Sequence, residues 1–374
     1  MLWNTGLWNT GTRNTGSWDT ELTRRLGLRL PVVQGPLGGG LSSVALVGAV
    51  ADAGGLGSFG VHHLAPQALL DTAALLRART SAPFALNLWM PCAYRQQKHI
   101  EPVQFARTLE LLAPFYDELG LALPEAPPAA WPDEREQMEA LLEARPAVFS
   151  FVFGIPPDDV LRRCRQLGIL TLGAATTVAE ARALEAAGVD MLVASGAEAG
   201  GHRVAFLEPP ERGLIGLFAL LPQVVDAVQI PVIGAGGIAD GRGMAAALLL
   251  GAQGVQLGTA FLACEESAAS AVQRASLFQP QASDTVLTRV FSGRLARGIH
   301  NEFVERLQTV EHSLPGYPLL NSLTAELKRA AVARQRPELM SLWSGQSAGL
   351  LRHRNAGAVL AALEGQAQAL LGRL

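Results

Sequence analysis

Short apolar runs alternate with longer amphipathic segments along most of the chain. Each apolar run is too short for a helix and is bounded by glycine or proline, which is typical of strands buried on both faces of a parallel sheet. The intervening segments open with residues that favour a helix start, such as serine, threonine or proline. The pattern predicts eight strands, at residues 32–34, 57–59, 84–88, 147–152, 169–172, 191–194, 231–233 and 254–257. It predicts helices at about 43–53, 66–79, 133–144, 158–167, 177–187, 217–227 and 241–250.

The order of these elements predicts an α/β fold, the (β/α)8 TIM barrel. An open, doubly wound parallel sheet is the main alternative, because short buried strands look alike in both folds. A barrel places its functional loops after the C-terminal ends of its strands. The unusual residues of this sequence do follow strands: Gln34-Gly35, Asn87, Gly154, Ser195 to His202, Gly234 to Gly237, and Gly258-Thr259. This agreement favours the barrel.

Three further regions flank or interrupt the predicted barrel, which spans residues 21–270. Residues 1–20 carry a degenerate repeat whose few apolar side chains cannot offset the entropy of ordering it, so we interpret them as a flexible low-complexity tail. Residues 90–132 form a proline- and loop-rich insertion after the third strand, with one helix predicted near 103–119, and are placed to act as a wall or lid. Residues 271–374 are expected to supply the last barrel helix and a helical C-terminal appendage that caps the barrel mouth.

The composition restricts the classes of partner. The chain has 374 residues, a net charge of -3 and a pI near 6.2, so no surface for nucleic acid or an anionic membrane is expected. No window holds the ~18 uninterrupted apolar residues of a membrane span, and the N-terminus lacks a signal-peptide pattern. The three cysteines form no CxxC pair, which favours a reducing, cytoplasmic setting. The expected partners are a small-molecule substrate and, in a homo-oligomer, another copy of the chain.

One glycine-rich loop carries the most distinctive candidate chemistry. The apolar run Met191 to Ala194 is followed by Gly196, then by Gly200-Gly201 and His202. A double glycine lets backbone amides approach a flat ring or an anion. Histidine titrates near neutral pH and can accept a proton from carbon, so His202 is the candidate catalytic residue. On this segment alone, a tight turn with one structural histidine remains the alternative.

Two later glycine turns predict a phosphate site. Gly234-Ala235-Gly236-Gly237 and Gln256-Leu257-Gly258-Thr259 follow the seventh and eighth strands, where barrels commonly bind phosphate. Neither turn matches a dinucleotide or nucleoside-triphosphate fingerprint. Flavin mononucleotide (FMN) has the length to reach from this rim towards His202, and the neutral amides of Gln34 and Asn87 suit its ring edges. The spacing of acidic and histidine residues predicts no metal site.

In order and combination these motifs resemble the nitronate monooxygenases, formerly called 2-nitropropane dioxygenases, which are FMN enzymes on a (β/α)8 barrel. The likeness covers about residues 28–264 and rests on Gln34-Gly35-Pro36, Asn87, Ser150 to Pro156, Gly196 to His202, Gly234 to Gly237 and Gln256 to Thr259. Further likeness lies at Gly293 to Gly298 and at Leu342 to Gln346. The resemblance implies that His202 is the active-site base. It implies a cofactor site made by Gln34, Gly35, Pro36, Asn87, Ser195, Gly200, Gly201, Gly236, Gly237, Gln256, Leu257, Gly258 and Thr259.

The resemblance also implies an activity. FMN-dependent enzymes of this family oxidise alkyl nitronates, and nitroalkanes, with O2 to carbonyl compounds and nitrite through one-electron transfer to the flavin. Two positions depart from the family pattern: Ser195 stands where a glutamine usually contacts the flavin, and Val204 replaces a glycine. An NAD(P)H-dependent flavin reductase of the same fold, acting as an enoyl-ACP reductase or a quinone reductase, is the alternative enzyme. Residues 90–132 and Trp343 to Gln346 favour the monooxygenase.

Other residues have plainer interpretations. His62-His63 follows the second strand and could face the same pocket as His202, but it is interpreted as a solvated pair at a helix start. Arg294 and Arg297 could contact a phosphate or a substrate carboxylate, but charges at helical spacing more often cap helix ends or pair with acids. A barrel that binds a ligand without catalysis is a further alternative, and the presence of His202 argues against it.

Overall fold

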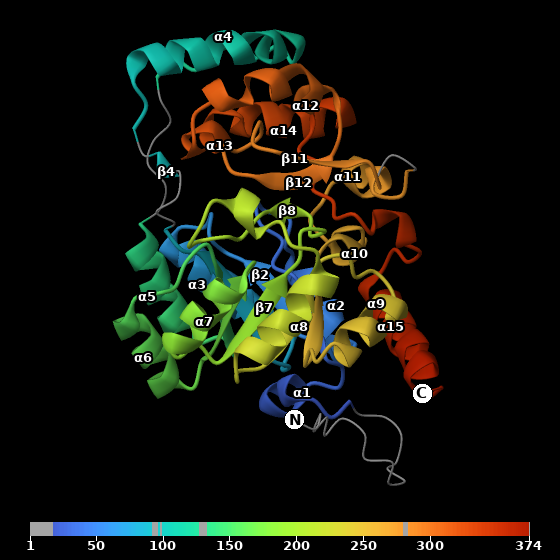
Figure 1. Ribbon diagram of the computed structural model, residues 1–374. Coiled ribbons are helices and arrows are strands. Elements are labelled where there is room, and N and C mark those ends of the chain that lie inside the picture. The colour runs from blue at the N-terminus through green and yellow to red at the C-terminus, as the bar shows by residue number, and fades with distance from the viewer. Residues whose placement is uncertain (1–17, 92–95, 98, 127–132, 280–282, 374) are drawn as a thin grey trace.

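The eight predicted strands form one closed parallel barrel (Figure 1). The computed structural model describes residues 18–91, 96–97, 99–126, 133–279 and 283–373. The sheet order is β1-β10-β9-β7-β6-β5-β3-β2, and a parallel bridge between Val33 and Leu56 joins its two edges. The strands are β1 (Val32–Gln34), β2 (Gly57–Gly60), β3 (Phe84–Trp89), β5 (Val148–Val152), β6 (Leu170–Ala175), β7 (Met191–Ser195), β9 (Val232–Ala235) and β10 (Gly254–Leu257). The barrel prediction is confirmed, and the open sheet is excluded because both edges are paired.

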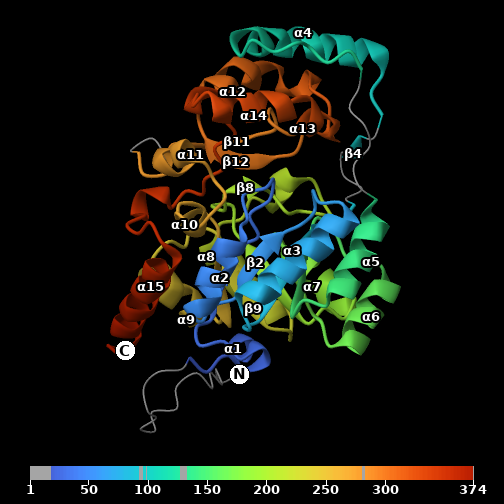
Figure 2. The ribbon, with the colours of Figure 1, turned by 180° about the vertical axis from the view of Figure 1, so that it is seen from behind.

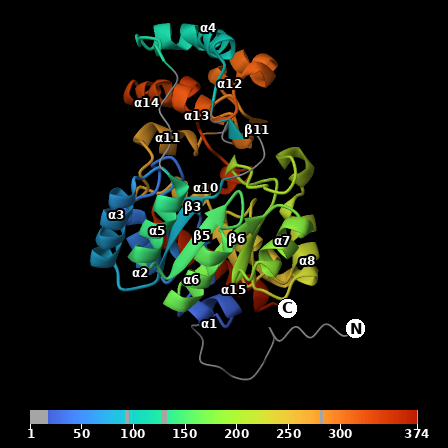
Figure 3. The ribbon, with the colours of Figure 1, turned by 90° about the vertical axis from the view of Figure 1, so that its left-hand side faces the viewer.

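Helices surround the barrel on all sides, as the views from behind and from the left-hand side show (Figures 2 and 3). They are α2 (Val44–Asp52), α3 (Pro66–Arg79), α5 (Glu134–Ala144), α6 (Asp158–Leu167), α7 (Val178–Ala186), α8 (Leu217–Ala227), α9 (Gly241–Leu249) and α15 (Ala356–Leu371). Their starts follow from side-chain caps: the Ser43 hydroxyl accepts from Leu46 N at 2.9 Å, and Thr177 caps α7 in the same way. The last barrel helix, α15, comes from the end of the chain and packs against α9 and α2.

The first described residues close the bottom of the barrel. Helix α1 (Glu21–Leu26) lies under the N-terminal ends of the strands (Figure 1), and the fully buried Leu22 packs with Val33, Ile233 and other barrel-interior side chains. The low-complexity tail predicted for residues 1–20 lies outside the described residues except for 18–20. In that short part, Trp18 is partly buried and Thr20 caps α1.

A second layer covers the opposite end of the barrel, where the strands have their C-terminal ends (Figure 1). It contains α11 (Ala271–Ser276), α12 (Glu302–Leu307), α13 (Leu319–Leu323), α14 (Ala325–Ala333) and the sheet β11 (Thr285–Thr288), β12 (Ala296–Ile299) and β8 (Gly201–His202). Short elements complete it: β4 (Gln96–Gln97), β13 (Tyr317–Pro318), α10 (Thr259–Leu262), η1 (Pro210–Gly213), η3 (Gln308–Ser313), η4 (Pro337–Leu339) and η5 (Ala348–Leu350).

The insertion after β3 joins this C-terminal layer. Its helix α4 (Pro102–Glu118) lies above the appendage in Figure 1, and the Tyr116 hydroxyl donates to Leu323 O at 2.7 Å. The rings of Phe115 and Phe303 lie 4.5 Å apart. The insertion therefore covers the appendage, which in turn covers the barrel mouth.

The appendage differs from its sequence-based description in one respect. It is largely helical, but residues 285–288 and 296–299 form the antiparallel strands β11 and β12. Arg297 lies on β12, where its Nε donates to Ala197 O at 3.0 Å, so the helix-capping interpretation of this arginine is wrong. None of the described helices is both long and apolar enough to cross a membrane.

Candidate active site

His202 lies between the barrel and the appendage. It belongs to the two-residue strand β8, which leaves the loop after β7 and pairs antiparallel with β12, placing His202 opposite Ala296. Its Nε2 lies 2.8 Å from the hydroxyl of Ser292, a buried residue in the turn before β12. The candidate base is thus fixed through its backbone and through one ring nitrogen.

Aromatic rings from four separate segments surround this imidazole. The ring centroid of Trp89, at the end of β3, lies 5.1 Å from that of His202, and Trp343 lies at 5.3 Å. Phe153 and Tyr317 each lie at 6.4 Å. These rings make the surroundings of the partly buried imidazole largely apolar.

His62 supports the aromatic group from behind. Its ring stacks on Trp89 with centroids 3.7 Å apart and an interplanar angle of 6°. The side chain is buried, and burial holds its pKa well below the ordinary value. The interpretation of His62-His63 as a solvated pair is therefore wrong for His62, because the end of β2 directs it into the barrel mouth.

Two cations act on His202 electrostatically. Burial, together with the smaller effect of the positive charges of Arg294 and Lys328, lowers the pKa of His202 to about 3. The Arg294 guanidinium lies 3.6 Å over the ring of Phe153. Burial also lowers the pKa of Lys328 to about 7, and its Nζ donates to Asn321 Oδ1 at 2.7 Å. The imidazole is consequently neutral at physiological pH and lies in a positive field.

Arg203, the neighbour of His202, holds the loop after β7 from inside. Its side chain is 1% exposed and its guanidinium donates to Gly196 O at 2.6 Å, Ser195 O at 2.9 Å and Gly213 O at 3.2 Å. Burial lowers its pKa to about 10, so it stays charged. Charge-assisted bonds of this kind to backbone carbonyls are strong in a buried setting. They fix the path of the chain into β8.

The two glycines before His202 serve different purposes. A Cβ on Gly200 would lie 2.5 Å from Gly345 N and 2.6 Å from Ser344 C, so this glycine permits the C-terminal segment to pack on the loop. Gly201 has φ +76°, and no other heavy atom of the described chain lies within 4 Å of its ideal Cβ position beyond its neighbours. Of these two glycines, therefore, only Gly201 faces open space.

The glycine turns after β9 and β10 lie on the same rim. Gly236 and Gly237 have φ of +108° and +71°, which disfavours any other residue there. Gly258 likewise has no described heavy atom within 4 Å of its ideal Cβ position, its neighbours excepted. Gly35 N donates to Leu257 O at 2.8 Å, and the Gly345 N–H donates to the hydroxyl of Thr259 at 2.9 Å. The structure thus brings the first and last strands together beside an open rim.

The remaining predicted cofactor residues are not equally available. Gln34 is fully buried, with Oε1 accepting from Ser58 N at 2.9 Å and Nε2 donating to Gly35 O. Asn87 Nδ2 donates to the Ser150 hydroxyl at 3.0 Å. Ser195 is buried at the end of β7, whereas Pro36 and Gln256 are partly exposed on the rim.

Sequence and structure comparisons agree on the family. The family model described as nitronate monooxygenase matches residues 19–362. The chain is 39% identical over 331 residues to a probable nitronate monooxygenase of Staphylococcus aureus, covering 87% of this chain and 91% of the relative. The chain belongs to the nitronate monooxygenase family. It is an oxidoreductase.

Two solved structures resemble this family member over nearly its whole length. A nitroalkane oxidase from Streptomyces ansochromogenes has a TM-score of 0.85 and 36% identity, covering 94% of this chain and 99% of that chain. FabK from Thermotoga maritima has a TM-score of 0.73 and 27% identity, with coverages of 95% and 98%. The overall arrangement of barrel and appendage is therefore shared with both proteins.

Several residues around His202 in this candidate site were not found by sequence reasoning. Ser292, Lys328, Trp89 and Tyr317 contact or act on His202, yet each lies far from it in the sequence. The glycine after Ser292 could have indicated that this turn packs against another segment. Gly293 has φ +81°, and a Cβ there would lie 2.5 Å from Gly316 C. Such a glycine marks a turn packed tightly on another segment.

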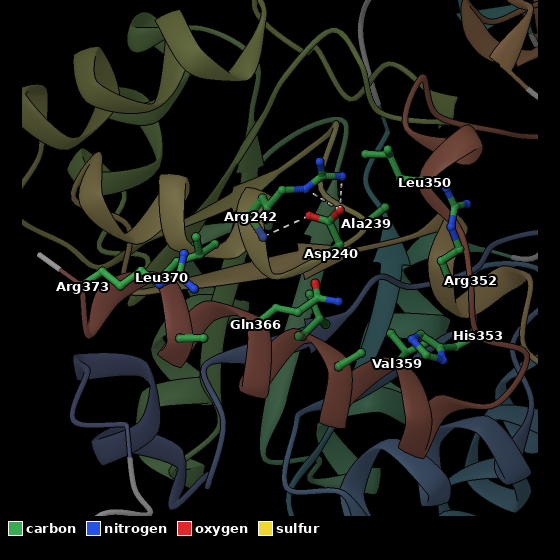
Figure 4. A pocket seen from close by; sticks show the side chains of 13 residues that line it. Ala239, Asp240, Arg242, Leu350, Arg352, His353, Val359, Gln366, Leu370 and Arg373 are labelled. Atoms are coloured by element: carbon green, nitrogen blue, oxygen red, sulfur yellow. Dashed lines mark hydrogen bonds and ion pairs between the residues drawn. The ribbon is translucent and has the colours of Figure 1, made fainter.

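A separate cavity of about 450 Å³ lies outside this site, between α9 and α15 (Figure 4). Its lining includes Asp240, Arg242, Arg352 and Gln366, and none of its described lining residues belongs to the His202 site. The Gln366 side chain accepts from Gly241 N at 2.9 Å, and Arg242 pairs with Asp240. Among the residues that the structure describes, no group of three or more His, Cys, Asp or Glu could hold a metal ion.

Proposed function

We propose that this chain is an FMN-dependent enzyme that oxidises alkyl nitronates with O2 to carbonyl compounds and nitrite. The observation that carries the proposal is the position of His202, which lies at the barrel mouth on the loop after β7, the strand next to β9. The 36% identity to a nitroalkane oxidase over 94% of the chain supports the same class of substrate. Barrel, insertion and appendage act together as one catalytic unit in this proposal.

The rim of the barrel fits FMN. Gly201 and Gly258 both face open space, and the left-handed turns at Gly236 and Gly237 provide the backbone conformation that anion-binding loops use. In the proposal, Gly236, Gly237 and the run Gln256 to Thr259 hold the phosphate. The backbone at Gly35-Pro36, with Asn87, Ser195, Gly200 and Gly201, flanks the ring. Bound FMN would supply the electron acceptor that no side chain here provides.

Contacts within the protein limit how Gln34 and Gly200 can contribute to a cofactor site. Because the Gln34 side chain bonds to Ser58 and Gly35, only its backbone is placed to approach the ring. The space where a Cβ of Gly200 would lie is filled by the backbone of Ser344 and Gly345, so Gly200 contributes only its backbone to the site. We propose that both residues contribute to the cofactor site through their backbone and not through a side chain.

The electrostatics favour the anionic nitronate over the neutral nitroalkane. Arg294 and Lys328 place two cations beside a neutral imidazole, an arrangement that stabilises an anion in an apolar enclosure. An imidazole whose pKa is about 3 is a weak base, so it removes a carbon-bound proton from a neutral nitroalkane slowly. His202 in this proposal orients the nitronate and takes a proton when the neutral substrate enters.

A flavin reductase that uses NAD(P)H is the second candidate, because FabK shares the fold at a TM-score of 0.73. Anaerobic stopped-flow mixing of the FMN-loaded protein with NADH and, separately, with propyl-2-nitronate separates the two. We expect a rapid change in the visible absorbance of the flavin with the nitronate and none with NADH. The reverse result would replace the monooxygenase by the reductase. A protein that stays colourless after incubation with FMN would instead favour the binding-only alternative.

A further inference from the structure

Ser292 is the nearest polar partner of His202 and comes from the appendage rather than from the barrel. Its hydroxyl lies 2.8 Å from His202 Nε2, and it also lies 3.3 Å from both the carbonyl oxygen and the backbone nitrogen of Arg294. The side chain is 1% exposed. The buried hydroxyl has one hydrogen, which it can donate either to His202 Nε2 or to Arg294 O. This choice determines which nitrogen of the imidazole carries hydrogen.

The turn that carries Ser292 is held on both sides. Phe291 O accepts from the Thr324 hydroxyl at 2.6 Å and from Lys328 Nζ at 3.4 Å. On the other side, Gly293 packs against the backbone of Gly316 so closely that a Cβ would not fit. These contacts fix the backbone on both sides of Ser292, and its hydroxyl is held beside His202 by the bonds to the imidazole and to the Arg294 backbone.

We propose that Ser292 is a positioning residue that fixes the tautomer of His202, with hydrogen on Nε2 and the lone pair on Nδ1. In this arrangement Nε2–H donates to Ser292 Oγ, and the Ser292 hydroxyl donates to Arg294 O. Nδ1 makes no hydrogen bond with the described residues, so it is the nitrogen left to face a substrate. A proton taken from substrate carbon would form the bond to Nδ1, and the electron pair of the broken C–H bond would remain on the nitronate.

The alternative arrangement has the opposite consequence. If Ser292 donated to Nε2 instead, hydrogen would lie on Nδ1 and His202 would offer substrate a donor but no base. The same logic governs metal-bound and triad histidines, where the group behind the ring selects the nitrogen that reacts. The inference rests on the proposed function for its catalytic meaning, but the tautomer itself is measurable without substrate.

The test combines NMR with kinetics on the full-length, FMN-loaded protein. Long-range ¹H–¹⁵N correlation of protein labelled with ¹⁵N-histidine, with the His202 signals assigned through their loss in His202→Asn, reports the tautomer directly. We expect a protonated Nε2 in the unmodified protein and a mixture of tautomers in Ser292→Ala. A protonated Nδ1 in the unmodified protein would overturn the proposal whether or not the enzyme oxidises nitronates.

Kinetics then test the consequence. For neutral 2-nitropropane, kcat/KM of Ser292→Ala should fall by about 10-fold or more, the scale of losing a group that orients a reacting histidine. Ser292→Thr, which keeps the hydroxyl, should restore both tautomer and rate. Ser267→Ala is the matched control, because Ser267 lies outside the site. Its buried hydroxyl donates to Leu262 O at 2.8 Å. Equal rates in the Ser292 and Ser267 alanine variants would contradict the proposal. So would a normal tautomer in Ser292→Ala.

Discussion

His202 and Ala296 face each other across two antiparallel strands, although 94 positions separate 202 from 296 in the sequence. One strand continues a barrel loop and the other belongs to the appendage. The backbone of the candidate base is therefore held by the layer that covers the barrel, and Trp343 joins the same layer through its bridge to Gly298. In the proposed function the barrel provides the rim that holds the cofactor, whereas the appendage fixes the position of the histidine.

Replacement of His202 separates its chemical role from cofactor binding. The variant His202→Asn keeps a polar side chain of smaller size, so we expect FMN and its yellow colour to be retained. Turnover of neutral nitroalkanes should fall by ~10² or more, the scale of a lost general base. Turnover of preformed nitronates should fall less, because no carbon-bound proton has to be removed. Steady-state oxygen consumption measures both, and unchanged nitroalkane turnover would exclude His202 from proton transfer.

The strands and most helices were predictable because each has a local signal. Residues 66–79 were predicted as a helix and form α3 (Pro66–Arg79), since proline at the first position and regular apolar spacing define it. The eighth strand, 254–257, was predicted with the bounds that the structure gives it. Such elements depend on nearest neighbours in the sequence, which a single chain displays fully.

The surroundings of the histidine were not predictable in the same way. Strand β8 has two residues, too few for any periodicity, and its partner β12 lies in a segment whose charges suggested a helix. Ser292 and Lys328 become site residues only through tertiary packing. The sequence pointed to the candidate base and to the glycine turns because these are unusual residues at strand ends. It could not show which distant segments enclose them.

We expect Lys328 to make the binding of an anionic substrate depend on pH near neutrality. Its pKa is lowered to about 7 by burial, so the positive charge is present below pH 7 and is lost as pH rises above it. An anionic nitronate should bind less well at pH 8 than at pH 6, with KM rising about 5-fold, the effect of ~1 kcal/mol of lost attraction. Lys328→Met should show the higher KM at both pH values.

A neighbouring residue offers the control for this effect. Arg329 lies next on α14 but is exposed, so Arg329→Met removes one positive charge without changing the enclosure of the site. Its KM should keep the pH dependence of the unmodified protein. A Lys328→Met variant that retains the rise in KM between pH 6 and pH 8 would assign the titration to another group.

Alanine at Gly200 should destabilise the protein through the appendage contact. The added methyl would lie within 2.6 Å of the Ser344–Gly345 backbone, which cannot rotate away as a side chain can. We expect the free energy of unfolding to fall by ~2 kcal/mol or more, a value typical of overpacking. Gly365→Ala is the control, since this glycine lies on the exposed face of α15 with nothing within 4 Å of its Cβ position. Alanine there should stabilise the helix by up to ~1 kcal/mol, and urea denaturation measures both changes.

The neutral state of His202 should make the fold sensitive to acid. Its pKa is about 3 in the folded protein and near 6.5 when exposed, so below pH 6.5 the unfolded chain binds a proton that the folded chain does not. The stability contributed by the neutral form is present above pH 6.5 and is progressively lost as pH falls towards 3. By pH 4.5, two units below 6.5, the loss should be on the order of 3 kcal/mol, since each pKa unit corresponds to ~1.4 kcal/mol. In urea denaturation of the apoproteins, the free energy of unfolding should therefore fall less between pH 6.5 and 4.5 in His202→Asn than in the unmodified protein. Equal losses in these two proteins would mean that other groups cause the sensitivity to acid.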